Sequence, residues 1–297
     1  MIDGGAPAAR TGAATLIGLG AILLWSALAL MTAASGQIPP FELAALTFLI
    51  GGLIGLAYAA ARGRLDALIQ PWPVWLVGVG GLFGYHALYF AALRLAPPAE
   101  ASLIAYLWPL LIVLMSALLP GERLSARHIV GALLGFAGAA VLFWGKVGAG
   151  AASLTHAVAL GYLLALGCAF VWSSYSVLSR RLRQAPTEAV AGFCLVTSAL
   201  AAICHAAFET TAIPENFSQA AAIVGLGLGP VGLAFYVWDY GVKNGDIRLL
   251  GVAAYAAPVL STLILVVAGF APAMPSLGIA CGLIMGGAVV ASRRSKG

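Results

Sequence analysis

Residues 249–292 read LLGVAAYAAPVLSTLILVVAGFAPAMPSLGIACGLIMGGAVVAS, a stretch of 44 residues without one charged side chain. A helix needs about 20 apolar residues to cross the roughly 30 Å hydrocarbon core of a bilayer. Pro272 and Pro275 interrupt the stretch near its middle, within the run APAMP at 271–275. The stretch therefore predicts two consecutive membrane-spanning helices.

The rest of the chain has the same character. Of its 297 residues, 62% are hydrophobic and 8% are charged, whereas soluble domains contain about 25% charged residues. This composition excludes a soluble protein and predicts an integral membrane protein. Charged and proline-rich positions divide the chain into ten apolar spans, which lie within 11–61 (two spans), 67–93, 101–121, 128–145, 147–179, 189–208, 216–238 and 249–292 (two spans).

The positive charges predict the orientation. If the amino terminus is cytoplasmic, all but two of the 15 Lys and Arg residues fall on the cytoplasmic side, the exceptions being Arg94 and Lys146. Membrane proteins show this bias because cytoplasmic loops retain Lys and Arg. We therefore expect both termini in the cytoplasm, and we attribute the pI of about 9.2 to orientation rather than to nucleic-acid binding. A cleaved signal peptide in the first span is the less favoured alternative, because the repeat described next requires that helix.

Two halves of the chain repeat the same pattern. The first and sixth spans contain Leu24-Trp25-Ser26-Ala27 and Val171-Trp172-Ser173-Ser174, and the fourth and ninth contain Tyr106-Leu107-Trp108-Pro109 and Tyr255-Ala256-Ala257-Pro258, each pair close to 150 residues apart. The second and seventh spans open with PFELAA and PTEAVA, and paired glycines recur in the fifth and tenth.

Five helices per half is an odd number, so the second half must enter the membrane from the opposite side. The predicted fold is an all-α integral membrane protein of ten transmembrane helices in two inverted five-helix repeats, residues 1–146 and 147–297. Inverted repeats are typical of secondary transporters, whose substrate site lies near the bilayer midplane between the repeats.

The block at 101–143 resembles a known repeat unit. It runs ASLIAYLWP, then an apolar segment, then PGERLS at 120–125, then Gly131 and Gly138. It is similar to the repeat of the EamA branch of the drug/metabolite transporter (DMT) superfamily, and 249–291 resembles the second copy. Glu122 has no counterpart near Ala271, and Thr47 occupies a position where such proteins often have Arg.

Within the superfamily, the aromatic-rich helices look most like the YddG-type amino-acid exporters. The resemblance implies an inner-membrane exporter of aromatic and neutral amino acids that needs no cofactor. Related carriers of drugs, nucleobases or sugar derivatives are the close alternatives.

Polar and aromatic side chains within the third span are candidates for a substrate site. Tyr85 and Tyr89 share one helix face, and His86 lies beside them. His86 is able to bind a substrate carboxylate or to accept a proton, because its titration is easily moved through physiological pH. A neutral histidine bonded within the protein is the structural alternative.

The fourth, sixth and ninth spans supply further candidates. Pro109 follows Tyr106 and Trp108, and Pro258 follows Tyr255. A proline removes one helical hydrogen bond and kinks the helix, and freed backbone groups are tolerated only against protein or a water-filled cavity. In the sixth span, Trp172 and Tyr175 stand in the polar run WSSYS. We expect all of these residues at a central cavity, with helix packing and interfacial aromatic residues as the alternative.

Three carboxylates near helix ends have structural alternatives. Asp239 is a candidate for a proton or a substrate amine, but Lys243 lies four residues later, where an exposed ion pair explains it equally well. Glu42 and Glu188 directly follow the prolines that open their helices, and we expect them to cap those helices.

The sequence therefore predicts a secondary transporter that works by alternating access about an aromatic-lined cavity. His86 and Asp239 are the only candidate proton carriers, so proton antiport and facilitated diffusion both stay open. We expect no metal site, a small-molecule substrate, the lipid bilayer as surroundings, and a monomer or a homodimer. An intramembrane enzyme would need a clustered catalytic set, and a channel would need a continuous polar stripe; neither pattern is evident, nor is an ATP-binding motif.

Overall fold

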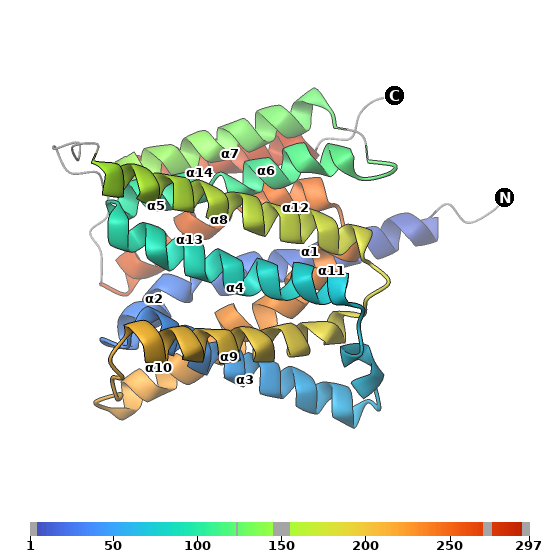
Figure 1. The fold of residues 1–297 in the computed structure, drawn as a ribbon. Coiled ribbons are helices and arrows are strands. Elements are labelled where there is room, and N and C mark those ends of the chain that lie inside the picture. Colours follow the sequence, from blue (N-terminus) through green and yellow to red (C-terminus); the bar gives the residue numbers. More distant parts are fainter. Residues whose placement is uncertain (1–4, 123, 145–154, 270–274, 293–297) are drawn as a thin grey trace.

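The structure is a computed structural model, and it describes residues 5–122, 124–144, 155–269 and 275–292. Within these ranges all regular secondary structure is helical. The long helices lie side by side in one bundle (Figure 1). Nine of the described segments have the length and hydropathy of a membrane span, and the shorter apolar helix at Ala126–Val141 supplies the tenth. The predicted all-α, ten-span architecture is confirmed.

Half of the spans are single helices and the others are divided. The single ones are α3 (Pro40–Ala61), α4 (Trp72–Leu95), α7 (Ala126–Trp144), α8 (His156–Arg181) and α14 (Pro275–Ser292). The divided ones are α1 (Gly5–Ser26) with α2 (Leu28–Ala34), α5 (Pro98–Ala105) with α6 (Trp108–Met115) and η2 (Ser116–Leu118), η3 (Thr187–Ala189) with α9 (Val190–Phe208), α10 (Phe217–Leu228) with α11 (Ala234–Asn244), and α12 (Ile247–Ala253) with α13 (Ala256–Val267). The short helix η1 (Leu65–Leu68) lies between α3 and α4.

Prolines and one π-helical segment account for three of these interruptions. The fourth span breaks at Tyr106–Leu107, before Pro109, and the ninth breaks at Ala254–Tyr255, before Pro258. A proline ring excludes the carbonyl four residues earlier from the helical ladder, so each helix restarts at the proline turn. The eighth span contains a π-helical turn at Gly229–Leu233, a feature often found at functional sites.

Helix packing follows the repeat. The most extensive contacts join α7 with α14, α3 with α9, α4 with α8, and α1 with α11. In the repeat, α1 corresponds to α8, α3 to α9, α4 to α11 and α7 to α14. The first two contacts therefore join corresponding helices, and the α4–α8 contact corresponds to the α11–α1 contact. In Figure 1, α1 and α8 run in opposite directions along the bundle, as inverted halves require. The boundary proposed between 146 and 147 lies outside the described residues.

Among the described residues, one end of the bundle carries most of the Lys and Arg side chains, and we call it the arginine-rich end. It contains Arg62, Arg64, Arg180, Arg181, Arg183, Lys243 and Arg248. The helices pack tightly there: α8 has most of its buried residues in its second half, from Cys168 onward, and α12 buries Ile247 and Leu250 completely. At the opposite end α2 has no fully buried residue. The bundle is thus closed more tightly at the arginine-rich end.

Arg180 ties several segments together at this end. Its guanidinium group donates to Glu122 at 2.6 Å and to the carbonyl oxygens of Val242 and Gly245 at 2.9 and 2.7 Å. Arg248 approaches the same glutamate at 3.4 Å. Glu122 therefore joins the α6–α7 connection to α8 and to α12.

At the opposite end, the residue that caps α3 differs from the one expected from the sequence. Glu209 caps α3, because its carboxylate accepts hydrogen bonds at 3.1 Å from the backbone N–H groups of Phe41 and Glu42. Arg94 and His205 also contact Glu209 at 3.1 Å. The expectation that Glu42 caps its own helix is therefore wrong; a glutamate 167 residues away does so, and Glu42 instead accepts from the N–H of Ala212. Glu188 pairs with Arg64 at 3.7 Å rather than capping its helix.

Candidate functional site

Four tryptophans meet at the centre of the bundle. They are Trp25, Trp108, Trp172 and Trp238, from α1, α6, α8 and α11. All six pairs of these rings are in contact, with centroid separations of 5.1–6.4 Å. Most of these contacts are edge-to-face or tilted, the arrangements that the ring quadrupole favours. Trp108, Trp172 and Trp238 are almost completely buried. Both repeats therefore contribute to one aromatic cluster.

A cavity of about 100 Å³ lies against this cluster. We call it the central cavity, and its lining comprises Trp25, Leu28, Tyr85, His86, Tyr106, Trp108, Trp172, Pro230, Val231, Phe235 and Ala257. Several of these residues stand at the interruptions of the first, fourth, eighth and ninth spans. The divided helices thus converge on one cavity, as expected where irregular backbone occurs at membrane depth.

Side chains satisfy backbone carbonyls around the interruptions. The indole N–H of Trp25 donates to the carbonyl oxygen of Pro230 in the π-helical turn at 3.1 Å. The hydroxyl of Ser173 donates to the carbonyl oxygen of Trp108 at 2.9 Å. An unsatisfied backbone group at membrane depth costs several kcal/mol, so these bonds stabilise the broken helices and fix the position of Trp25.

His86 has one ring nitrogen engaged within its own helix. Its Nδ1 lies 2.7 Å from the carbonyl oxygen of Leu82. A carbonyl oxygen only accepts, so Nδ1 carries the proton and Nε2 of the neutral ring is an acceptor. The ring packs edge-on against Phe48 at 5.0 Å and next to Tyr85 at 5.3 Å. His86 is therefore both bonded internally and present in the cavity wall, which fits either sequence interpretation.

The structure brings five of the predicted site residues to the central cavity: Tyr85, His86, Tyr106, Trp108 and Trp172. Two others stand directly behind them. Tyr89 stacks on Tyr85 at 5.9 Å and shares a hydrogen bond with Ser102. Tyr175 packs on Trp172 at 5.1 Å and is almost completely buried. These two tyrosines support the cavity wall rather than line it.

Tyr255 lies away from the central cavity, contrary to expectation. Its ring is fully buried, and its hydroxyl accepts a hydrogen bond from the backbone N–H of Leu110 at 3.1 Å. That N–H follows the break at Tyr106–Leu107, where the regular helical acceptor is displaced. Tyr255 therefore links the ninth span to the interrupted fourth span and stabilises the interruption. Pro109 and Pro258 are also buried, one in each of these two spans.

Asp239 is paired with Lys243, as in the structural alternative, but the pair is buried rather than exposed. Lys243 Nζ lies 2.8 Å from Asp239 Oδ2, and the two side chains are 5% and 1% exposed. Thr187 donates to the same carboxylate oxygen at 2.8 Å, and Lys243 donates to the carbonyl oxygen of Ala185. Asp239 is not among the residues that line the central cavity. It joins α11 to the segment that opens the seventh span.

Sequence reasoning left three aromatic residues out of the site. Trp25 and Phe235 line the central cavity, and Trp238 completes the tryptophan cluster. The repeat offered one usable signal, since Trp25 matches Trp172. Phe235 and Trp238 both lie on α11, whose charged residues Asp239 and Lys243 are themselves buried and so do not mark the outward face of the helix. Among the described residues, no three His, Cys, Asp or Glu side chains are grouped so as to hold a metal ion.

Comparison with known proteins places this architecture in a family. The model of the EamA-like transporter family matches the chain twice, at residues 12–144 and 159–293. The chain belongs to the EamA-like transporter family. The two matches correspond to the two five-helix repeats, and the chain is accordingly a multi-pass membrane transporter.

Its relatives include named exporters. The aromatic amino acid exporter YddG of Ancylobacter novellus is 61% identical over 94% of this chain and 96% of its own length. The proteins of the same name from Escherichia coli K12 and Salmonella typhimurium are 26% and 27% identical, over 93% and 84% of this chain and 96% and 86% of theirs. A crystal structure of a protein 60% identical to this chain superposes with a TM-score of 0.90, over 95% of this chain and 96% of the other.

Proposed function

We propose that this transporter exports amino acids, aromatic ones among them, from the cytoplasm by alternating access. The observation that carries the proposal is the central cavity, where helix interruptions from both repeats meet four tryptophans. The 61% identity to a protein named as an aromatic amino acid exporter supports the same substrate class. An apolar, aromatic wall favours flat or aliphatic side chains, and few charges are available to select an ionic solute.

The substrate backbone needs polar partners that the cavity wall contains. Its carboxylate and ammonium groups must replace water on entering an apolar site. Tyr85, Tyr106 and His86 offer hydroxyl and imidazole groups, and the interrupted helices offer backbone carbonyls. We assign the zwitterion to these groups and the substrate side chain to the tryptophans.

The central cavity must enlarge to accept such a ligand. Its volume of about 100 Å³ is below the roughly 300–1,000 Å³ of typical ligand pockets. An aromatic amino acid therefore requires the rings of Trp25, Trp108 and Trp172 to move apart. Substrate binding is expected to alter tryptophan fluorescence for this reason.

We assign the arginine-rich end and both termini to the cytoplasm, because positive residues are retained there. On this assignment the tightly packed end is the cytoplasmic gate, and the looser opposite end faces outward. Opening of the gate would have to separate Arg180 from Glu122 and the α11–α12 turn. We place the repeat boundary between residues 146 and 147, within the connection between α7 and α8.

Proton coupling, if present, falls to His86 rather than to Asp239. His86 stands in the cavity wall, whereas Asp239 is held by Lys243 and Thr187. Facilitated diffusion needs no proton carrier at all. A pH gradient imposed across proteoliposomes distinguishes the two, since only antiport gives concentrative uptake driven by the gradient.

Counterflow in proteoliposomes tests the proposed substrate class. The purified chain is reconstituted into proteoliposomes. Separate samples are preloaded with phenylalanine, alanine, glutamate, a nucleobase or a sugar derivative, and uptake of the matching labelled solute is measured. We expect the fastest counterflow with phenylalanine. Counterflow of a nucleobase or sugar derivative with none for any amino acid would refute the proposal, and hydrolysis of a lipid-soluble ester by the same sample would favour an intramembrane enzyme.

A further inference from the structure

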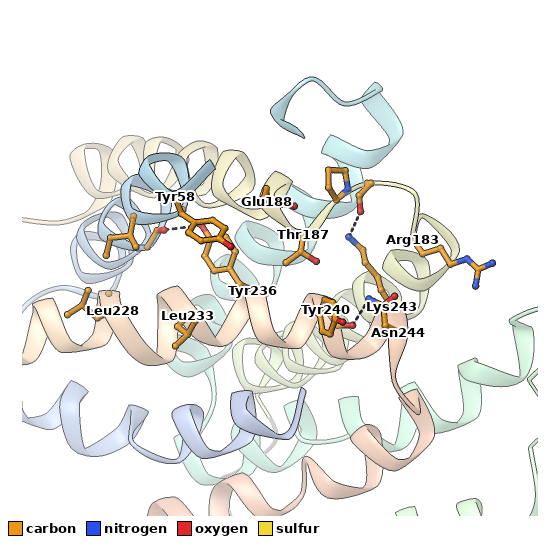
Figure 2. A pocket seen from close by; sticks show the side chains of 16 residues that line it. Tyr58, Arg183, Thr187, Glu188, Leu228, Leu233, Tyr236, Tyr240, Lys243 and Asn244 are labelled. Atoms are coloured by element: carbon orange, nitrogen blue, oxygen red, sulfur yellow. Dashed lines mark hydrogen bonds between the residues drawn. The ribbon is translucent and has the colours of Figure 1, made fainter. Parts of the chain in front are cut away.

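A second cavity, of about 690 Å³, lies on the side of the bundle toward the arginine-rich end (Figure 2). It runs between α3 and the eighth span, and the linker that opens the seventh span closes one end of it. We call it the side groove, and the residues that define it here are Ile54, Tyr58, Arg183, Leu228, Leu233 and Tyr240. It shares no lining residue with the central cavity.

A hydrogen bond between α11 and α3 crosses the side groove. Tyr236 also lines the groove, and its hydroxyl donates to the carbonyl oxygen of Gly51 at 3.0 Å. A Cβ atom at Gly55 would meet this hydroxyl at 1.8 Å, so α3 needs a glycine there. The π-helical turn Gly229–Leu233 lies in the wall between the two cavities, with Leu233 facing the groove and Pro230 facing the central cavity.

The apolar part of the side groove is open to the bilayer. Ile54, Leu228 and Leu233 are 48%, 50% and 53% exposed although they lie in membrane spans. Along the eighth span, the groove extends from Gly227 to Asn244, a helical rise of roughly 25 Å. Half of the hydrocarbon core is roughly 15 Å. The groove therefore extends along one leaflet from the interface toward the midplane, where acyl chains are the solvent.

The other part of the side groove is polar and has a surplus of positive charge. Its lining includes Glu188, which pairs with Arg64 at 3.7 Å, and Lys243, which pairs with Asp239 at 2.8 Å. Tyr58 and Tyr240 are exposed there, in the manner of tyrosines at the membrane interface. Arg183 lines the groove and in Figure 2 extends outward beyond it, and the guanidinium group of Arg62 lies 5.7 Å from the ring centroid of Tyr58. Within the described part of the chain, neither arginine has a carboxylate oxygen within 4.0 Å.

We propose that the side groove binds one anionic diacyl phospholipid from the surrounding leaflet. One acyl chain lies along Ile54, Leu228 and Leu233, and the phosphate lies at the mouth beside Arg183 and Arg62. The order of these groups, apolar toward the midplane and cationic at the interface, matches the order of groups in a phospholipid. Two guanidinium groups without a carboxylate partner favour an anionic headgroup over a zwitterionic one, because each basic residue near the surface attracts anionic lipid.

Native mass spectrometry of the full chain tests the site without depending on the transport substrate. The purified protein is titrated separately with phosphatidylglycerol and with phosphatidylethanolamine. We expect one phosphatidylglycerol molecule to be retained per chain with higher affinity than phosphatidylethanolamine. Arg183→Gln should weaken retention about fivefold, the effect of removing one cation close to the headgroup. Ile54→Trp should also reduce retention, because the indole fills the groove.

Two matched variants control for general effects. Leu53→Trp adds the same ring at the neighbouring position, which is 50% exposed and outside the groove. Arg10→Gln removes an exposed arginine elsewhere in the chain. Both should retain lipid as the wild type does. If Ile54→Trp fails to purify as a folded protein, Leu233→Phe serves in its place.

The proposal would be overturned by equal affinity for the two phospholipids, by unchanged retention in both groove variants, or by losses in the control variants as large as those in the groove variants. Retention of a free fatty acid with the affinity of phosphatidylglycerol would also overturn it, because the headgroup contact would then contribute nothing.

Discussion

The buried pair of Asp239 and Lys243 gives a stability prediction that can be worked from its geometry. Lys243 Nζ lies 2.8 Å from Asp239 Oδ2, and Thr187 donates to the same oxygen. Lys243→Met removes the cation and leaves a carboxylate that is 1% exposed with one hydroxyl donor. Removing one partner of a buried pair costs about 3–5 kcal/mol. Because Lys243 also borders the side groove, we expect the lower end, about 3 kcal/mol.

Equilibrium unfolding in mixed micelles, followed by the fluorescence of the seven tryptophans, measures this loss. Asp239→Leu combined with Lys243→Met should recover most of it, since no isolated charge then remains. Asp66→Asn is the matched control, because that carboxylate is 74% exposed beside Arg64 and should change stability by at most about 1 kcal/mol. A change below about 1 kcal/mol for Lys243→Met, or a double variant as unstable as the two single losses added together, would refute the reasoning.

Three further substitutions test other contacts by the same unfolding measurement. Glu209→Gln should cost about 2–3 kcal/mol, because the charged acceptor of the Phe41 and Glu42 N–H groups is lost, whereas Glu215→Gln at an exposed site should have little effect. Gly55→Ala should destabilise strongly through its clash with the Tyr236 hydroxyl, and adding Tyr236→Leu should restore stability; no recovery would exclude that clash as the cause. Trp25→Phe should cost about 1–3 kcal/mol by leaving a carbonyl of the π-helical turn unsatisfied, and an unchanged stability would mean that another donor replaces the indole.

The sequence determines the architecture well because the bilayer restricts it so strongly. Charged side chains are excluded from the hydrocarbon core, so the gaps between them count the spans, and recurrent residues such as Trp25 and Trp172 mark the repeat. Tyr85 and His86 were identifiable as site candidates because polar and aromatic groups are unusual within a span, and Tyr106 and Trp108 because they directly precede Pro109.

Features that depend on helix rotation and packing were not predictable. Phe235 and Trp238 were overlooked because α11 buries its charged residues Asp239 and Lys243 together with them, so the polar residues of this helix do not mark its outward face. Tyr255 was assigned to the cavity because the sequence does not show against which helix its ring packs. The cap that Glu209 supplies to α3 and the burial of Asp239 both arise from segments distant in sequence. The π-helical turn and the side groove likewise exist only once α3 and the eighth span have packed.

The claim that the central cavity is the transport site is tested most directly by counterflow of labelled phenylalanine. Proteoliposomes containing the wild type, Trp108→Ala, His86→Gln and Trp72→Ala are compared at equal amounts of folded protein, with Trp72 as the control because it is 74% exposed at the start of α4. Trp108→Ala removes one or two aromatic contacts with the substrate ring, each worth about 0.5–1.5 kcal/mol. This predicts about tenfold slower counterflow for the variant. His86→Gln should be slowed as well, and Trp72→Ala should match the wild type. Wild-type counterflow in both Trp108→Ala and His86→Gln would contradict the account.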